Sequence, residues 1–124
     1  MQELEIKIRP MPKQSVRFTK SGYAYQPKKI VDYQKAIHLY AKSQKIKMLE
    51  GAILIEIDSH YQKKNVKSPI PKITRPDVDN LAKPILDALN GVAWKDDSRV
   101  CELRLRKFHD SEDKIVIRIS EINT

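Results

Sequence analysis

Apolar residues repeat along this chain with two different periods, and the order of those periods limits the folds that it can adopt. Alternation of apolar and polar side chains, typical of a strand with one buried face, occurs at residues 4–8, 53–58, 99–108 and 114–120. Spacing of three or four residues, typical of an amphipathic helix, occurs at residues 28–45 and 78–89. The order β-α-β-α-β-β predicts an α+β domain with a small mixed β-sheet and two helices.

Several single residues refine this prediction. Pro84 lies inside the second helical pattern, where proline costs about 3 kcal/mol, so we expect that helix to begin late or to kink. Asn90-Gly91 is a typical helix end. The segment HDSEDK, residues 109–114, is a hairpin candidate between the last two strands, and Cys101 stands at an apolar strand position that predicts core packing.

The length of 124 residues predicts one domain, residues 1–124. No run of roughly 18 apolar residues is present, so we expect a soluble protein that is not exported. Cys101 is the only cysteine, which excludes an intramolecular disulfide and agrees with a reducing, cytoplasmic location.

Charge is distributed unevenly along the chain. The net charge is +8, but residues 1–76 contribute 16 − 6 = +10 and residues 77–124 contribute 8 − 10 = −2. Such a basic field attracts polyanions and favours nucleic acid as the partner. An anionic membrane is disfavoured, because no basic amphipathic helix with an aromatic face is present.

Two basic segments are expected to be exposed. Residues 13–29 interleave cations with aromatic residues around a Ser-Gly turn and predict a loop or hairpin. Residues 61–76 predict a long extended loop. The candidate phosphate contacts are Lys13, Arg17, Lys20, Lys63, Lys64, Lys67, Lys72 and Arg75. Tyr23 and Tyr25 are compatible with stacking on unpaired bases and equally with packing in the fold.

Acidic residues gather in the middle of this basic chain, in two blocks. Asp77 and Asp79 stand where the long loop meets the second helix, and Asp96 and Asp97 directly precede the third strand. Neighbouring carboxylates repel by roughly 4 kcal/mol at 4 Å unless a proton or a cation intervenes. Oxygen ligands suit Mg²⁺, so converging carboxylates indicate metal-assisted phosphodiester hydrolysis. Helix capping and an ordinary turn remain alternative explanations.

Three more residues belong to this region. Lys83 follows Asp79 by four residues on the same helical face, where it can neutralise charge in a transition state or form a simple ion pair. Asp87 is expected to serve such a helix pair rather than the metal. Trp94 is interpreted as a packing anchor that positions Asp96 and Asp97.

The two acidic blocks resemble a known family. Asp77-Val78-Asp79-Asn80-Leu81-Ala82-Lys83 and Trp94-Lys95-Asp96-Asp97 are similar to the D-x-D-N-L-x-K and W-x-D-D motifs of RusA Holliday-junction resolvases, which occur in bacteria and prophages. The strong match covers about a quarter of the chain, and length, element order and the P-x-P-K-Q run at residues 10–14 agree with it.

This resemblance implies a homodimeric endonuclease that cuts two strands of a four-way junction symmetrically, in DNA recombination and repair. It implies that Asp77, Asp79 and Asp97 bind Mg²⁺, with Mn²⁺ as a substitute, and that Asp96 adjoins them. Lys83 matches the catalytic lysine and Asn80 a residue that orients the acids. A non-catalytic basic DNA-binding module is the alternative, in which the acids are only caps and turns.

Overall fold

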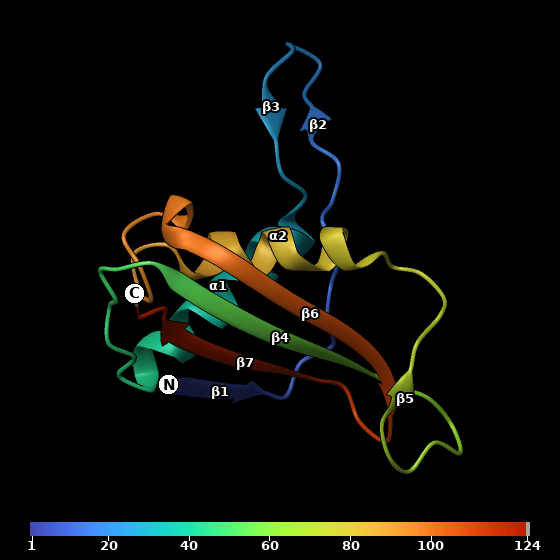
Figure 1. Ribbon diagram of the computed structural model, residues 1–124. Coiled ribbons are helices and arrows are strands. Elements are labelled where there is room, and N and C mark those ends of the chain that lie inside the picture. The colour runs from blue at the N-terminus through green and yellow to red at the C-terminus, as the bar shows by residue number, and fades with distance from the viewer. Residues whose placement is uncertain (124) are drawn as a thin grey trace.

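The computed structural model describes residues 1–123 and has the predicted α+β architecture (Figure 1). Two α-helices, α1 (Lys28–Ser43) and α2 (Val78–Leu89), lie on one face of a five-stranded mixed sheet. The sheet order is β1-β7-β4-β6-β5. Its strands are β1 (Gln2–Ile6), β4 (Ile53–Gln62), β5 (Ile70–Pro71), β6 (Val100–Asp110) and β7 (Lys114–Glu121). A separate hairpin is formed by β2 (Arg17–Phe18) and β3 (Ala24–Tyr25).

The core lies between the two helices and the sheet, and it follows from the two apolar periods. The alternating isoleucines of β4 and β7 point to the helices and are fully buried. Ile30, Ile37 and Ala41 of α1, and Ile85 and Leu89 of α2, complete the same apolar cluster. The predicted main elements are therefore confirmed. The predicted order of α-helices and strands omitted only the short strands β2, β3 and β5.

The HDSEDK hairpin prediction is wrong. β4 lies between β6 and β7, parallel to β6 and antiparallel to β7, so residues 111–113 cross the end of β4 instead of joining neighbouring strands. The crossing is held by polar contacts. Asp113 Oδ1 accepts a hydrogen bond from the Gln62 amide at 2.7 Å, and the Asp110 carbonyl accepts one from the Lys63 amide at 2.9 Å.

The prediction that Cys101 packs in the core is also wrong, because its side chain is exposed. The alternation of residues 101–105 does put Leu103 on the helix-facing side of the sheet beside Ile55. However, β6 pairs with β5 only at Phe108 and His109, so within residues 1–123 most of its outer edge lacks a neighbouring strand. Leu103 remains 42% exposed there, which shows that the helices do not cover the whole sheet face.

Helix α2 runs through Pro84 as one element from Val78, so of the two expected outcomes, a late start or a kink, the late start is wrong. Proline has no amide hydrogen, so the carbonyl of Asn80, four residues earlier, loses its usual partner in the helix. The Lys13 amide donates to that carbonyl at 2.7 Å. The N-terminal segment thus supplies the missing hydrogen bond and is fixed against α2 by it.

Among the described residues, no helix has both the length and the apolar character needed to cross a membrane.

Candidate active site and nucleic-acid interface

The first acidic block sits at the start of α2. Asp77 is the N-cap residue, with φ −73° and ψ 150°, and Asp79 lies in the first helical turn. The Asp77 carbonyl accepts a hydrogen bond from the Leu81 amide at 3.3 Å, whereas its carboxylate makes no capping hydrogen bond. Both acidic side chains are exposed. Capping therefore does not account for the Asp77 carboxylate, which stays available for a ligand.

The second acidic block is positioned by a buried tryptophan. Trp94 is fully buried, which agrees with its interpretation as a packing anchor. Its Nε1 donates to Asn90 Oδ1 at 2.7 Å. Its carbonyl accepts from the Gly91 amide at 2.8 Å, which closes the turn after α2. Gly91 has φ +82°, a conformation that favours glycine. This turn leads directly into Asp96 and the short 3₁₀ helix η1 (Asp97–Arg99).

Lys83 links helix α2 to the second acidic block. Its Nζ lies 3.4 Å from Asp97 Oδ2 and 2.9 Å from Asp87 Oδ1. The hydrogen bond with Asp87, and then the interaction with Asp97, raise the pKa of Lys83 above its usual value. Asp87 thus forms the expected i,i+4 pair. The Ser98 hydroxyl is the main influence that lowers the pKa of Asp96, and the charge of Lys83 lowers it further.

The carboxylates fit a hard divalent cation in chemistry but do not form one assembled ligand set. Within residues 1–123, no three acidic, histidine or cysteine side chains are grouped closely enough to hold a metal ion. The acids of the first block stand at the first turn of α2, while Asp97 contacts Lys83 in the second turn. Mg²⁺ prefers oxygen ligands, and carboxylates supply them.

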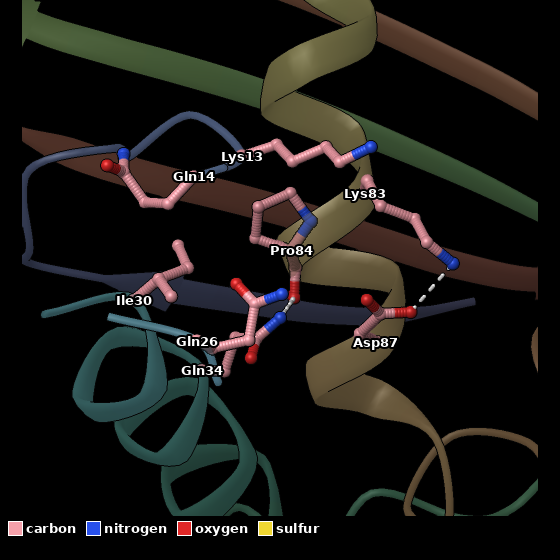
Figure 2. Close-up of a pocket in the computed structure, with 8 residues that line it drawn as sticks. All are labelled: Lys13, Gln14, Gln26, Ile30, Gln34, Lys83, Pro84 and Asp87. Atoms are coloured by element: carbon pink, nitrogen blue, oxygen red, sulfur yellow. Dashed lines mark hydrogen bonds and ion pairs between the residues drawn. The ribbon is translucent and has the colours of Figure 1, made fainter. Parts of the chain in front are cut away.

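Lys13 lies alongside this helix and borders several hollows. One, of about 280 Å³, is lined by Lys13, Arg75, Asp77 and Asn80 among others. Another, of about 200 Å³, is shared by Lys13 with Lys83, Pro84 and Asp87, and Figure 2 shows these side chains with Gln14 and Gln26. The predicted contact Lys13 thus flanks both the first acidic block and Lys83.

A cluster of cationic side chains surrounds Tyr61 near β5. Lys72 Nζ and the Arg9 guanidinium lie 5.1 and 4.9 Å from the centre of the Tyr61 ring. Burial lowers the pKa of Lys72, and the charges of Lys107, Arg9 and Lys63 lower it further. Burial and the charges of Lys72 and Lys63 also lower the pKa of His109. Positive potential is concentrated here, as a phosphate site requires.

Lys107 was not among the predicted residues, and it holds the segment that leads to Asp77. Its Nζ donates to the carbonyls of Thr74 and Pro76 at 2.8 Å each. The peptide bond between Arg75 and Pro76, inside this braced segment, is cis. Arg9 was missed as well. Lys107 lies in a strand-like pattern and Arg9 directly follows one, where a single charge resembles the ordinary solvated side of a strand.

The other predicted contacts fall into two groups. Arg17 and Lys20 lie on the β2–β3 hairpin, and Lys63, Lys64 and Lys67 lie on the loop before β5, all with exposed side chains. The hairpin prediction for residues 13–29 is confirmed. Packing does not account for Tyr23 and Tyr25, which are 75% and 47% exposed.

Comparison with known proteins gives two findings. The family model of endodeoxyribonuclease RusA matches residues 7–120, nearly the whole chain. The uncharacterized protein YqaN of Bacillus subtilis (strain 168) is 39% identical over 62 residues, which are 50% of this chain and 44% of YqaN. The chain therefore matches less than half the length of that relative.

Proposed function

The chain belongs to the endodeoxyribonuclease RusA family, and we propose that it is a metal-dependent nuclease that cuts two strands of a four-way DNA junction symmetrically. Membership implies a Holliday-junction-resolving endonuclease. The proposal adds Mg²⁺ as the metal, with Mn²⁺ as a substitute, and a homodimer acting in DNA recombination and repair. A two-fold dimer would present two identical sites to the equivalent strands of a junction.

We assign the metal to Asp77, Asp79 and Asp97, with Asp96 beside them. A bound divalent cation would activate water and stabilise the leaving oxygen. The observation that supports this assignment most is the 3.4 Å contact between Lys83 Nζ and Asp97 Oδ2, which ties the helix of the first acidic block to the second.

Lys83 and Asn80 act beside the acids in this proposal. The Lys83 ammonium, half exposed, contacts the phosphate oxygens as negative charge develops on them. Lysine is protonated at neutral pH, and the two carboxylate partners favour this charged form further by raising its pKa. Asn80, whose backbone is fixed through Lys13, orients the carboxylates of the first block.

DNA would be held by cations on two segments of the chain. Lys13, Arg17 and Lys20 lie on the N-terminal segment and its hairpin, and Lys72 and Arg75 lie on the loop before Asp77. Lys63, Lys64 and Lys67 extend that second group. Contacts to phosphate fix the position of DNA without reading its sequence, and they make affinity depend on salt.

The test is a four-way junction with each strand labelled in turn, incubated with the protein and Mg²⁺ or Mn²⁺. Paired symmetric nicks are expected, and EDTA should abolish them. The Asp79→Asn variant should bind the junction and fail to nick it. Asp32→Asn is the matched control, because Asp32 is also an exposed helical carboxylate but lies on α1; it should cut normally.

Two outcomes would overturn the proposal. Undiminished cutting by Asp79→Asn would remove the acids from the chemistry. Binding without cleavage of any junction, flap or duplex, in either metal, would leave a basic DNA-binding module in which the acids serve only as turns.

A further inference from the structure

The β2–β3 hairpin exposes more aromatic surface than its fold needs. Phe18, Tyr23 and Tyr25 are 66%, 75% and 47% exposed, although aromatic side chains usually supply core or interface packing. The register pairs Arg17 with Tyr25 and Phe18 with Ala24. Side chains alternate across a strand pair, so Arg17, Tyr23 and Tyr25 share one face and Phe18 lies on the other.

The hairpin is closed by its own turn and not by the core. The Thr19 amide donates to the Tyr23 carbonyl at 2.9 Å, and the Tyr23 amide donates to Thr19 Oγ1 at 3.1 Å. Gly22 occupies φ +89° in that turn. In Figure 1 the two short strands project away from the sheet and helices. A hairpin with aromatic side chains thus extends into solvent.

Both legs of the hairpin are anchored at the candidate active site. Its first leg is fixed by the 2.7 Å hydrogen bond from the Lys13 amide to the Asn80 carbonyl, which Pro84 leaves free. Gln14 of this leg and Gln26 of the other line the same hollow as Lys83 (Figure 2). The second leg continues into α1 at Lys28. The position of the hairpin is therefore tied to the helix that carries the proposed catalytic residues.

Charge indicates the partner of these aromatic residues. Arg17 and Lys20 lie on the hairpin itself and Lys13 lies at its base, so the hairpin suits a polyanion. Aromatic side chains bind nucleic acid by stacking on base faces, and they do so with little regard to sequence. In a continuous duplex those faces are already stacked on their neighbours. A branch point interrupts the stacking and offers free base faces.

We propose that the β2–β3 hairpin recognises the branch point. Phe18, Tyr23 and Tyr25 stack on bases that have lost a neighbour there, while Arg17 and Lys20 contact the adjacent phosphates. This inference rests on the proposed function, since it names the part of the DNA that the same site recognises. It explains how a small nuclease can select a branch without reading base sequence.

The test compares binding in EDTA, where no cleavage occurs, to a four-way junction and to a duplex of the same length. The variant carries Phe18→Ala, Tyr23→Ala and Tyr25→Ala. Its junction affinity should fall by about tenfold or more, because each stacked base contributes about fivefold or more and three aromatic side chains are removed. Its duplex affinity should change little. A 2-aminopurine base at the branch should change fluorescence with the wild type and not with the variant. One placed within an arm should respond to neither.

Leu39→Ala is the matched control, because Leu39 is a 56% exposed apolar residue of α1 away from the hairpin; it should bind like the wild type. The exposed hairpin residues do not support the core, so the triple variant should keep its circular dichroism and melting temperature. Equal losses on junction and duplex would overturn the proposal, as would unchanged binding. Loss of self-association with unchanged DNA affinity would overturn it too, in favour of a protein contact.

These readouts separate the two proposals. Branch-dependent fluorescence in a protein that never nicks DNA would support the hairpin and overturn the nuclease assignment. Symmetric, branch-selective nicking by the triple variant would support the nuclease and overturn the role of the hairpin.

Discussion

Lys83 and Lys72 carry the same ammonium group in opposite surroundings. Two carboxylates flank Lys83, at 2.9 and 3.4 Å, and raise its pKa. Burial and three neighbouring cations lower the pKa of Lys72. The first region therefore has an excess of anions and favours a further cation, whereas the second has an excess of cations and favours a phosphate. The comparison separates the region suited to chemistry from the region suited to holding DNA.

The two regions also differ in how the backbone supports them. Lys83 stands on α2, which is packed against the core and fixed to the N-terminal segment at Asn80. Lys72 stands on the loop between β5 and α2, where Lys107 braces the next residues through two carbonyls. A rigid helix keeps catalytic groups in position, while a loop can adapt to a curved DNA backbone.

The largest expected effect comes from Asp97→Asn. It removes a proposed metal ligand, and we expect junction cleavage to fall by about 10²–10³-fold, the loss typical of one electrostatic element of a site. Junction affinity in EDTA should not decrease. Asp87→Asn is the control, because it removes the nearer partner of Lys83 and leaves the proposed metal ligands intact. Equal losses in both variants would mean that Lys83 pairing, and not the metal, explains the effect.

Pro84→Ala tests the support of the first region. The new amide at position 84 can bond the Asn80 carbonyl within the helix and so displace the Lys13 amide, a hydrogen bond worth about 1 kcal/mol. Hydrogen exchange of the Lys13 amide should become faster. Unchanged protection of that amide would contradict the tether. Pro69→Ala, in the loop before β5, is the control and should leave Lys13 exchange unaltered.

Lys72→Gln tests the second region. Removing one phosphate contact should weaken binding to all DNA shapes alike and reduce the slope of log affinity against log salt by about one. Cleavage of bound junction should remain at the wild-type rate. Lys35→Gln, an exposed cation on α1, is the matched control. A loss of cleavage rate at saturating protein would place Lys72 in the chemistry and remove the distinction between the regions.

The main elements were predictable because their signals are local. The alternating isoleucines of β4 and β7 and the helical spacing of α1 each depend on neighbours within a few residues. The pairing of β6 with β4 was not predictable, since a turn signal at residues 109–114 gives no information about which strand lies alongside. The prediction for Cys101 was wrong for a related reason. Periodicity identifies the face of a strand on which a residue lies, but not how much of that face a helix covers.

The candidate site was predictable as a set of residue types but not as a geometry. The motifs contained Lys83 and Asp97, yet their contact depends on the Trp94 turn that lies between them. Lys13 and Asn80 lie far apart in sequence, and the one clue was Pro84, whose missing amide leaves a carbonyl in need of a donor. The role of Lys107 could not be predicted, because its hydrogen bonds to the Thr74 and Pro76 carbonyls depend on strand register.

The smallest effect concerns alkaline pH, where the two lysines should act in opposite directions. The pKa of Lys83 in the folded protein is above the reference value of 10.5, so its stabilising contribution is complete below 10.5 and is lost as pH rises through the folded value. The pKa of Lys72 is below 10.5, so the folded state binds fewer protons there than the unfolded state. The contribution of Lys72 to stability therefore rises as the pH increases from its pKa in the folded protein to 10.5.

Titration of the two side-chain ammonium groups by NMR measures this directly. Lys72 should lose its proton at lower pH than Lys83. Asp87→Asn should lower the pKa of Lys83 and leave that of Lys72 unchanged, because the hydrogen bond with Asp87 is the main cause of the first shift. The effect on melting temperature should be slight, since both side chains remain in contact with solvent. Coincident titration of the two lysines would show that their surroundings are electrostatically alike, which would remove the basis for assigning one region to metal and the other to phosphate.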